Sequence, residues 1–330
     1  MGAGIVGAVS PRARVSALVA AAAVAAAGAT VLATALTRTD PPPEAASPTA
    51  GPRPGVPPLV LDLGVRIDPE ARALRRAATL YERKRRADAG GIFDRYDSVE
   101  ANVGAALSRW PAGFGRLESI ARSEPDSGAA LLNLGLAHYW QGRVGDARRA
   151  WRRAKLAAPD TEYAVRAGDL LHPEYPVPGL PTYVPGFSSP PELDRLSPPA
   201  QLALLERRAR DGGRDEKLLY GVALQRLGRP LSAERQFRAA AALAPRDPEA
   251  LTALAVGRFD KDSPSQAFSQ LGPLARRFPE AATVRFHLGL LLLWMGRVDG
   301  AKRQLRLAVA AEPGSVYAKQ AAAFLERLRG

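Results

Sequence analysis

Prolines recur at a fixed interval of 34 residues along much of this 330-residue chain. The intervals from Pro125 to Pro159, from Pro245 to Pro279 and from Pro279 to Pro313 all have this length. A strict period of about 20 to 50 residues is typical of chains in which one small supersecondary unit stacks on copies of itself. The period therefore predicts an array of repeats in place of the two globular domains that length alone suggests.

Between these prolines the same residue types return at the same positions of the unit. Small residues at positions 8 and 20 let two helices approach closely, and a large apolar residue at position 24 fills the space to the next unit. Glycine at position 15 favours the left-handed turn that ends the first helix, and proline at position 32 stops the second. Positions 8, 15, 20, 24 and 32 hold Gly135, Gly142, Ala147, Trp151 and Pro159 in residues 128–161; Gly221, Gly228, Ala233, Phe237 and Pro245 in residues 214–247; Gly289, Gly296, Ala301, Leu305 and Pro313 in residues 282–315; and, with the largest departures, Ala255, Asp262, Ala267, Leu271 and Pro279 in residues 248–281.

This pattern resembles the tetratricopeptide repeat (TPR) family, whose 34-residue signature it matches in three units and largely in a fourth. The resemblance implies an all-α fold, a right-handed α-solenoid of helix–turn–helix units. We expect repeats at residues 128–161, 162–213, 214–247, 248–281 and 282–315, closed by a capping helix in residues 316–330. Residues 59–127 hold the expected N-terminal helices, including one long basic helix over Pro69–Ala87 and a degenerate repeat behind it.

The unit at residues 162–213 is 18 residues too long for the period. Glu162–Leu171 reads as its first helix, Pro199–Arg210 reads as its second, and a proline-rich insertion, residues 172–198, separates them. The arithmetic favours one continuous array with an enlarged turn inside this unit. The alternative is two short solenoids joined by a linker.

The first residues of the chain differ from the rest in composition. Behind a short segment, residues 1–14, the run Val15–Thr37 has no charged residue and at about 1.5 Å per residue could span a hydrocarbon core of about 30 Å. It reads as a transmembrane signal anchor, or as a signal peptide cleaved after Ala33-Thr34-Ala35. Residues 38–58 hold eight prolines and read as a disordered Pro-rich linker.

The flanking charges favour a single-pass membrane protein with its C-terminal part outside the cytoplasm, because Arg12 and Arg14 precede the run. Two alternatives remain open: secretion after cleavage, and a cytoplasmic location of the repeats.

In the family, positions 2, 5, 9, 12 and 13 of each first helix line a concave groove, and the resemblance carries this role onto the residues at positions 5, 9, 12 and 13 here. They are apolar or aromatic for the most part, which argues against a carboxylate clamp and favours a hydrophobic or amphipathic segment of a protein or peptide partner. In the alternative, the same residues pack against neighbouring helices or are covered by Tyr183 and Phe187 of the insertion. The candidates are Leu132, Leu136, Tyr139, Trp140, Leu218, Val222, Gln225, Arg226, Thr252, Val256, Phe259, Asp260, Phe286, Leu290, Leu293 and Trp294.

Basic residues exceed acidic ones, 46 against 33, for a net charge of +13. A cluster surrounds Trp151 on a predicted second helix, consisting of Arg148, Arg149, Arg152, Arg153 and Lys155. We interpret these residues as a solvated helix face, with attraction to an anionic lipid or polymer as the alternative. We do not expect nucleic acid as a partner, because the one aromatic residue in the cluster stands at a core position.

No residue pattern supports catalysis. The chain lacks cysteine, its three histidines (His138, His172 and His287) are far apart, and no nucleophile elbow, phosphate loop or zinc-protease motif occurs. We therefore expect no enzyme activity, no cofactor and no metal site. The sequence predicts a membrane-tethered scaffold or adaptor that binds a protein partner through its groove, with a basic docking module or an accessory subunit of an envelope enzyme as alternatives.

Overall fold

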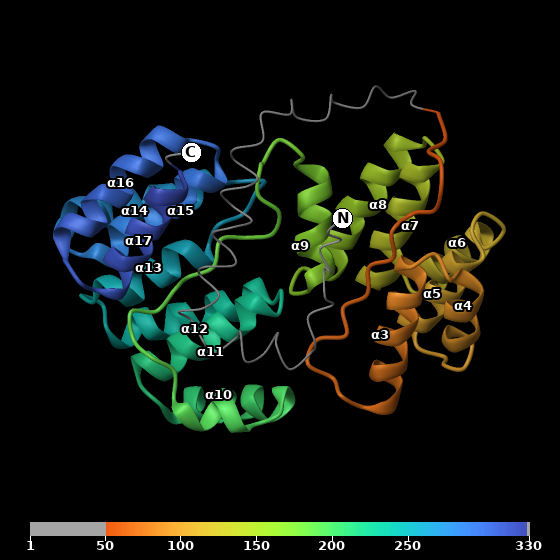
Figure 1. The fold of residues 1–330 in the computed structure, drawn as a ribbon, viewed down its shortest axis with the longest axis horizontal. Helices are drawn as coiled ribbons and strands as arrows, with labels where there is room; N and C mark the ends of the chain where they lie inside the picture. Colours follow the sequence, from red (N-terminus) through yellow and green to blue (C-terminus); the bar gives the residue numbers. More distant parts are fainter. Residues whose placement is uncertain (1–50, 329–330) are drawn as a thin grey trace, which may run out of the picture.

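A computed structural model describes residues 51–328, and the predicted membrane anchor over residues 15–37 lies outside them. The described part is all-α, with fifteen α-helices and one short 3-10 helix, η1 (Figure 1). No helix within these residues is long and apolar enough to cross a bilayer. The elements are α3 (Pro69–Glu82), α4 (Arg86–Phe93), α5 (Val99–Ser108), α6 (Phe114–Ser123), α7 (Gly128–Trp140), α8 (Val144–Ala157), α9 (Glu162–Leu171), η1 (Pro191–Arg195), α10 (Pro198–Asp211), α11 (Arg214–Arg226), α12 (Pro230–Leu243), α13 (Pro248–Gly257), α14 (Ser265–Arg277), α15 (Ala282–Trp294), α16 (Val298–Ala311) and α17 (Val316–Arg327).

The predicted helix–turn–helix units are confirmed where the repeat signature is strongest. The pairs α7–α8, α11–α12 and α15–α16 each pack as antiparallel neighbours. Their turns contain Gly142, Gly228 and Gly296 at φ of 77°, 68° and 68°, the left-handed region that glycine adopts without steric cost. A Cβ atom on Gly135 would stand 2.3 Å from the Trp151 indole, so the small residue at position 8 is required by the large one at position 24.

The prediction of one long helix over Pro69–Ala87 is wrong. The chain leaves the helix after Glu82, turns at Lys84 with φ of 63°, and re-enters a helix at Arg86. The pair α3–α4 is therefore a further repeat in which Lys84 stands where three other units have Gly142, Gly228 and Gly296. Ala77, Ala89 and Phe93 at its positions 8, 20 and 24 are fully buried.

The stack is divided inside the unit predicted at residues 162–213. Helix α9 packs against α7 and α8, α10 packs against α11, and α9 and α10 do not pair with each other. We call α3–α9 the N-terminal array and α10–α17 the C-terminal array. This is the arrangement of the second alternative, two short solenoids joined by a linker.

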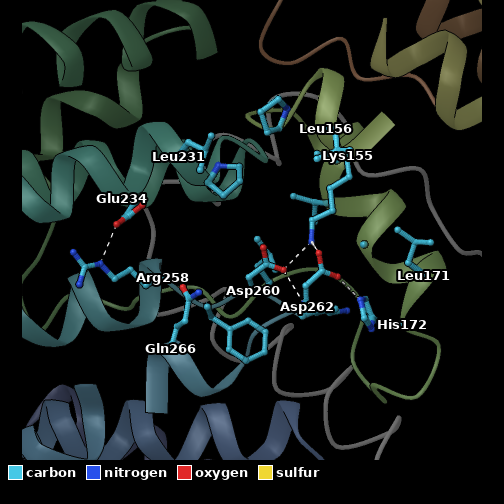
Figure 2. A pocket seen from close by; sticks show the side chains of 18 of the residues that line it. Lys155, Leu156, Leu171, His172, Leu231, Glu234, Arg258, Asp260, Asp262 and Gln266 are labelled. Carbon is cyan, nitrogen blue, oxygen red and sulfur yellow. Dashed lines mark hydrogen bonds and ion pairs between the residues drawn. The ribbon is translucent and has the colours of Figure 1, made fainter. Parts of the chain in front are cut away.

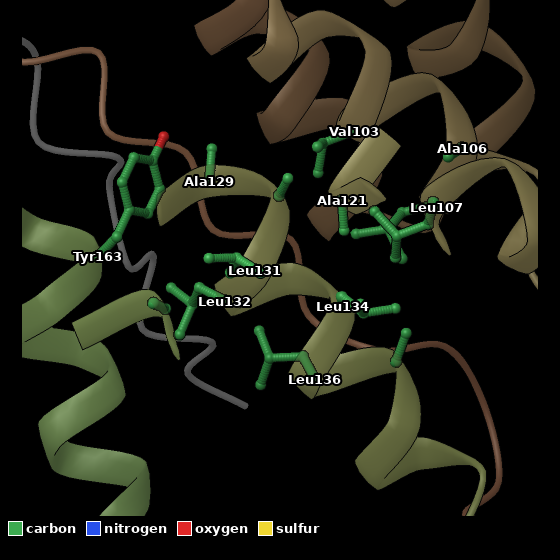
Figure 3. Packing of buried hydrophobic residues seen from close by; sticks show 14 of the residues in the cluster. Val103, Ala106, Leu107, Ala121, Ala129, Leu131, Leu132, Leu134, Leu136 and Tyr163 are labelled. Carbon is green, nitrogen blue, oxygen red and sulfur yellow. The ribbon is translucent and has the colours of Figure 1, made fainter. Parts of the chain in front are cut away.

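Each array has its own apolar core. In the N-terminal array, α7 contributes leucines on several sides: Figure 3 shows Leu131, Leu132, Leu134 and Leu136 between the helices that carry Leu107 and Tyr163. In the C-terminal array two large clusters of buried residues follow α11–α15 and α15–α17, and a small third cluster joins η1 and α10 to α11. The final helix α17 packs on α15 and α16, as expected of a helix that caps the stack.

Candidate functional site

The sixteen predicted groove residues do not form an open surface. Ten are buried and six are half-buried: the buried ones are Leu132, Leu136, Leu218, Val222, Thr252, Val256, Phe259, Phe286, Leu290 and Leu293, and the half-buried ones are Tyr139, Trp140, Gln225, Arg226, Asp260 and Trp294. Two coil segments of the same chain lie against the arrays (Figure 1). We call residues 53–63 the first strap and residues 177–187 the second strap.

The first strap is bound to the N-terminal array through its backbone. The Asn133 side chain accepts a hydrogen bond from Val60 N at 3.0 Å and donates one to Val60 O at 2.8 Å. The Tyr163 hydroxyl accepts a further bond from Asp62 N at 2.8 Å. A side-chain amide that meets both polar groups of one residue holds the chain whatever side chain that residue carries.

The start of the first strap also departs from the sequence prediction. Residues 53–58 belong to the segment expected as a disordered linker, yet Arg53 N donates to the Trp140 carbonyl at 2.7 Å. The Arg53 guanidinium lies 4.0 Å from the centre of the Tyr139 ring. The Tyr81 hydroxyl, which is buried, donates to Pro57 O at 2.7 Å. These contacts fix this part of the Pro-rich segment on the array.

The second strap fills the C-terminal array. Its Tyr183 side chain is fully buried and meets the Phe237 ring edge-on at a centroid distance of 5.7 Å. Tyr183 N donates to Gln225 Oε1 at 2.9 Å, and Val184 N donates to His287 Nε2 at 3.0 Å. The alternative that the insertion covers the groove through Tyr183 is therefore the one observed.

Glu249 connects this strap to two helices. Its Oε1 accepts bonds from the Tyr183 hydroxyl at 2.8 Å and from Gly186 N at 2.5 Å. The Tyr317 hydroxyl lies 2.7 Å from the same oxygen and 3.0 Å from Val184 O, so its proton is shared between them. Arg214 lies 3.7 Å from the other oxygen of Glu249. These hydrogen bonds lie in a part-buried place, where an unpaired polar group would be costly.

The two straps are held from equivalent repeat positions. Asn133 and His287 both stand at position 6 of their units, and Tyr163 and Tyr317 both stand at position 2 of the following unit. The sequence analysis did not include position 6 among the groove positions. The sequence contained a signal, because position 6 is polar in the two units where its residue binds a strap, with Asn133 and His287, and apolar in two units where it does not, with Leu219 and Ala253.

The bonding of His287 fixes its protonation. Its Nδ1 lies 2.7 Å from the Thr283 carbonyl, which can only accept, so Nδ1 carries the proton and Nε2 is free to accept from Val184 N. The ring stacks on Tyr183 at 5.0 Å. Full burial lowers the pKa of His287 to about 4, which keeps the ring neutral at pH 7.

A cavity of about 850 Å³ lies between the two arrays (Figure 2). Its walls come from α8 and α9 on one side and from α12, α13 and the turn after α13 on the other. Lys155 Nζ reaches across to Asp260 Oδ1 at 2.8 Å and Asp262 Oδ2 at 2.6 Å. Burial opposes the charge of Lys155, but the two carboxylates outweigh it and raise its pKa. We call this cavity the cleft.

Two further contacts hold the arrays side by side near the cleft. Asp160 Oδ1 accepts from Leu231 N at 2.9 Å and Ser232 N at 3.0 Å, so a residue of the N-terminal array caps the first turn of α12. Arg229 pairs with Asp62 of the first strap at 2.8 Å. The segments on the two sides of the cleft are thus joined at several points.

The predicted basic cluster is divided between two faces of α8. Arg148, Arg152 and Lys155 line the cleft, whereas Arg149 and Arg153 do not. Arg149 pairs with Asp146. Trp151 is buried in the core, as expected from its position in the unit.

Comparisons with known proteins give partial likenesses only. No known protein family and no curated protein matches this chain. Among solved structures, a similar chain occurs in the Cut9–Hcn1 hetero-tetramer of the APC/C, with 18 % sequence identity, coverage of 78 % of this chain and 52 % of that chain, and a TM-score of 0.30. A tetratricopeptide repeat protein from Parabacteroides merdae has 10 % identity, coverage of 79 % of this chain and 99 % of that chain, and a TM-score of 0.32. Yeast Tom70 has 9 % identity, coverage of 90 % of this chain and 69 % of that chain, and a TM-score of 0.30. The match spans about half the length of the first of these chains. TM-scores this low carry no argument about the fold. The description of this chain as an array of helix–turn–helix repeats rests on its own 34-residue period and its own helix pairs.

The buried Tyr183 gives a first testable prediction. We expect Tyr183→Ala to lower the free energy of unfolding of the C-terminal array by about 3 to 5 kcal/mol, because a large buried ring leaves a cavity. Tyr183→Phe, which removes only the bond to Glu249, should cost about 1 kcal/mol. Urea denaturation with hydrogen exchange of the α15 amides measures both. The neighbouring Thr182→Ala is the control, and a cost for Tyr183→Ala no larger than for this control contradicts the role of the strap.

His287 makes the stability depend on pH in a defined direction. The unfolded chain protonates this residue near its ordinary pKa of about 6.5, and the folded chain near 4, so the unfolded state binds more protons between these values. The contribution is present above about pH 6.5 and is lost as the pH falls to 4, by about 3 kcal/mol. We expect His287→Gln to reduce the loss of stability between pH 7 and pH 4 by this order. Urea denaturation at a series of pH values measures this. If the free energy of unfolding falls equally with pH in the unaltered protein and in His287→Gln, His287 does not titrate as described. Glu249, Tyr183 and Tyr317 are present in both proteins, so their titration does not account for a difference.

Proposed function

We propose that this chain is a non-catalytic scaffold that binds a protein partner, and that the partner binds in the cleft between the two arrays. The repeat architecture supports the class of function, because stacked helix pairs present extended surfaces to other proteins. The observation that carries the choice of site is that both grooves hold the chain's own straps, whereas the cleft is open, with Leu156 at its wall 79 % exposed.

Displacement of the second strap by a partner is energetically unfavourable. A competing segment would have to replace the burial of Tyr183 and the bonds that Gln225, Glu249 and His287 make to the strap backbone. Burial of one aromatic side chain alone is worth about 3 kcal/mol. We therefore move the proposed binding surface from the apolar groove to the cleft, and keep the sequence-based idea that the partner is a protein or peptide.

Photo-crosslinking from chosen positions tests the site. A photoreactive amino acid at Leu156 or at Leu231, which is 42 % exposed at the opposite wall, should crosslink one and the same protein in the cells that make this chain. Matched controls are Leu243 and Leu307, which are 58 % and 45 % exposed but lie outside the cleft. Adducts of equal yield from the control positions, or no adduct from either cleft position, would refute the cleft as the binding site.

We further propose that the scaffold is tethered to a membrane, with its arrays outside the cytoplasm. The support is the uncharged run Val15–Thr37, about 34 Å long as a helix, and the two arginines before it. The full chain should resist extraction from membranes by alkaline carbonate, and deletion of residues 15–37 should release it. A topology reporter fused after Gly330 should be active outside the cytoplasm. A mature chain that begins after Ala35, or a reporter active only in the cytoplasm, would disprove the tether or its orientation.

A further inference from the structure

The charges that line the cleft are not evenly matched. Glu234 pairs with Arg258 at 3.0 Å, and Asp260 and Asp262 pair with Lys155. His172 lies against Asp262 as well, and the buried Lys261 is paired with Asp169 at 2.6 Å. All three carboxylates in the lining therefore have a cationic partner within the protein.

Two arginines of the lining have no acidic partner within the part of the chain that the structure describes. Arg148 and Arg152 are exposed, and neither makes a hydrogen bond or an ion pair within residues 51–328. They stand four residues apart on α8, so their side chains leave the same face of the helix, about 6 Å from each other along its axis. Two positive charges of the cleft are thus available to a ligand.

Apolar side chains lie next to these charges. Leu156 follows Arg152 by one further turn of α8, in the same line along the helix. On the other side of the cleft Pro230 and Leu231 begin α12, and Figure 2 shows Leu231 and Leu156 at opposite walls. Leu156 is 79 % exposed and Leu231 is 42 % exposed. Apolar side chains on both walls of a concave site are typical of a pocket that takes an apolar group.

We propose that the cleft binds a segment of a partner protein that carries two carboxylates beside a large apolar residue. The carboxylates pair with Arg148 and Arg152, and the apolar residue enters between Leu156 and Leu231. A volume of about 850 Å³ accommodates several side chains of one segment. This inference rests on the proposed function, for which the cleft is the binding site, and adds the chemistry of the occupant.

A nucleic acid strand fits the lining less well. Single strands bind where basic residues alternate with exposed aromatic rings on which bases stack. The lining has two aromatic rings. Phe259 is 4 % exposed and belongs to the core of the C-terminal array, and His172 is held by its ring nitrogens between Glu174 and Asp262. The exposed leucines instead favour an apolar side chain from a protein.

The experiment selects peptides from a random displayed library on the folded full-length protein and measures the affinity of the enriched synthetic peptides by fluorescence anisotropy. We expect enrichment of Asp and Glu together with Leu, Ile or Phe. The double variant Arg148→Glu/Arg152→Glu should weaken binding about tenfold or more, because it replaces two attractive charges by two repulsive ones. The matched control is Arg149→Glu/Arg153→Glu, which makes the same change of charge on the face of α8 away from the cleft and should alter the affinity less than about twofold.

Several outcomes would overturn the proposal. Peptides without acidic residues, or equal weakening by the two double variants, would exclude recognition by Arg148 and Arg152. Binding of an oligothymidine probe that exceeds peptide binding and is lost in Arg148→Glu/Arg152→Glu would assign these arginines to phosphate instead. If the crosslinks from Leu156 and Leu231 persist in the charge-reversed variant, the proposed chemistry fails while the cleft stays the binding site; if they are absent in the unaltered protein, the proposed function itself fails. Circular dichroism melts of both variants check that the fold is kept.

Discussion

The hydrogen bonds that groove side chains make to the backbone of the straps are the interactions on which this structure depends. The face of each array that a strap covers is lined mostly by apolar side chains, and the helices of the array alone cannot cover it. A coil segment can, but it brings backbone N–H and C=O groups into a place without water, and these must be paired. Asn133, Glu249 and His287 supply that pairing. Without them the straps would carry unpaired polar groups, and the two cores would be open on one side.

The second strap also explains why the stack is divided. Residues 177–187 lie between α9 and α10 in the chain and occupy the inside of the C-terminal array. The segment between α9 and α10 runs into the C-terminal array as far as His287, and α10 then packs on α11 and not on α9. One helix pair of the repeat array is therefore absent from residues 51–328, and the segment between its two helices fills the groove of the C-terminal array. The two arrays then meet along α8, α9, α12 and α13, and the cleft is the space that this side-by-side contact leaves.

The repeat pattern predicted the local structure well, because the residues that make it act within one unit. Gly142 sets its own turn, and Gly135 makes room for Trp151 only sixteen residues away. The turn at Lys84 was missed because a left-handed lysine has no sequence signature. The burial of Ala77 and Phe93 in the same unit offsets the energetic cost of this conformation. The contents of the grooves could be only partly foreseen. An apolar lining is compatible with a partner, a neighbouring helix or the chain itself, and only the path of residues 177–187 decides among them.

The cleft was beyond the reach of sequence patterns because its parts come together from distant segments. Lys155 and Asp260 are separated by 105 positions, and nothing in either neighbourhood indicates the other. The helix α8 shows how such contacts give different roles to the basic residues of one cluster. Its core face carries Ala147, Ala150, Trp151 and Ala154, its cleft face carries Arg148, Arg152 and Lys155, and its remaining face carries Arg149 and Arg153. The five cations look equivalent in the sequence, yet Lys155 joins the arrays, Arg149 pairs on its own helix, and Arg148 and Arg152 are left facing the cleft with no carboxylate of their own. Net charge is a sum over residues in such different positions, and only the fold separates the charges that hold the protein together from those that are available to a partner.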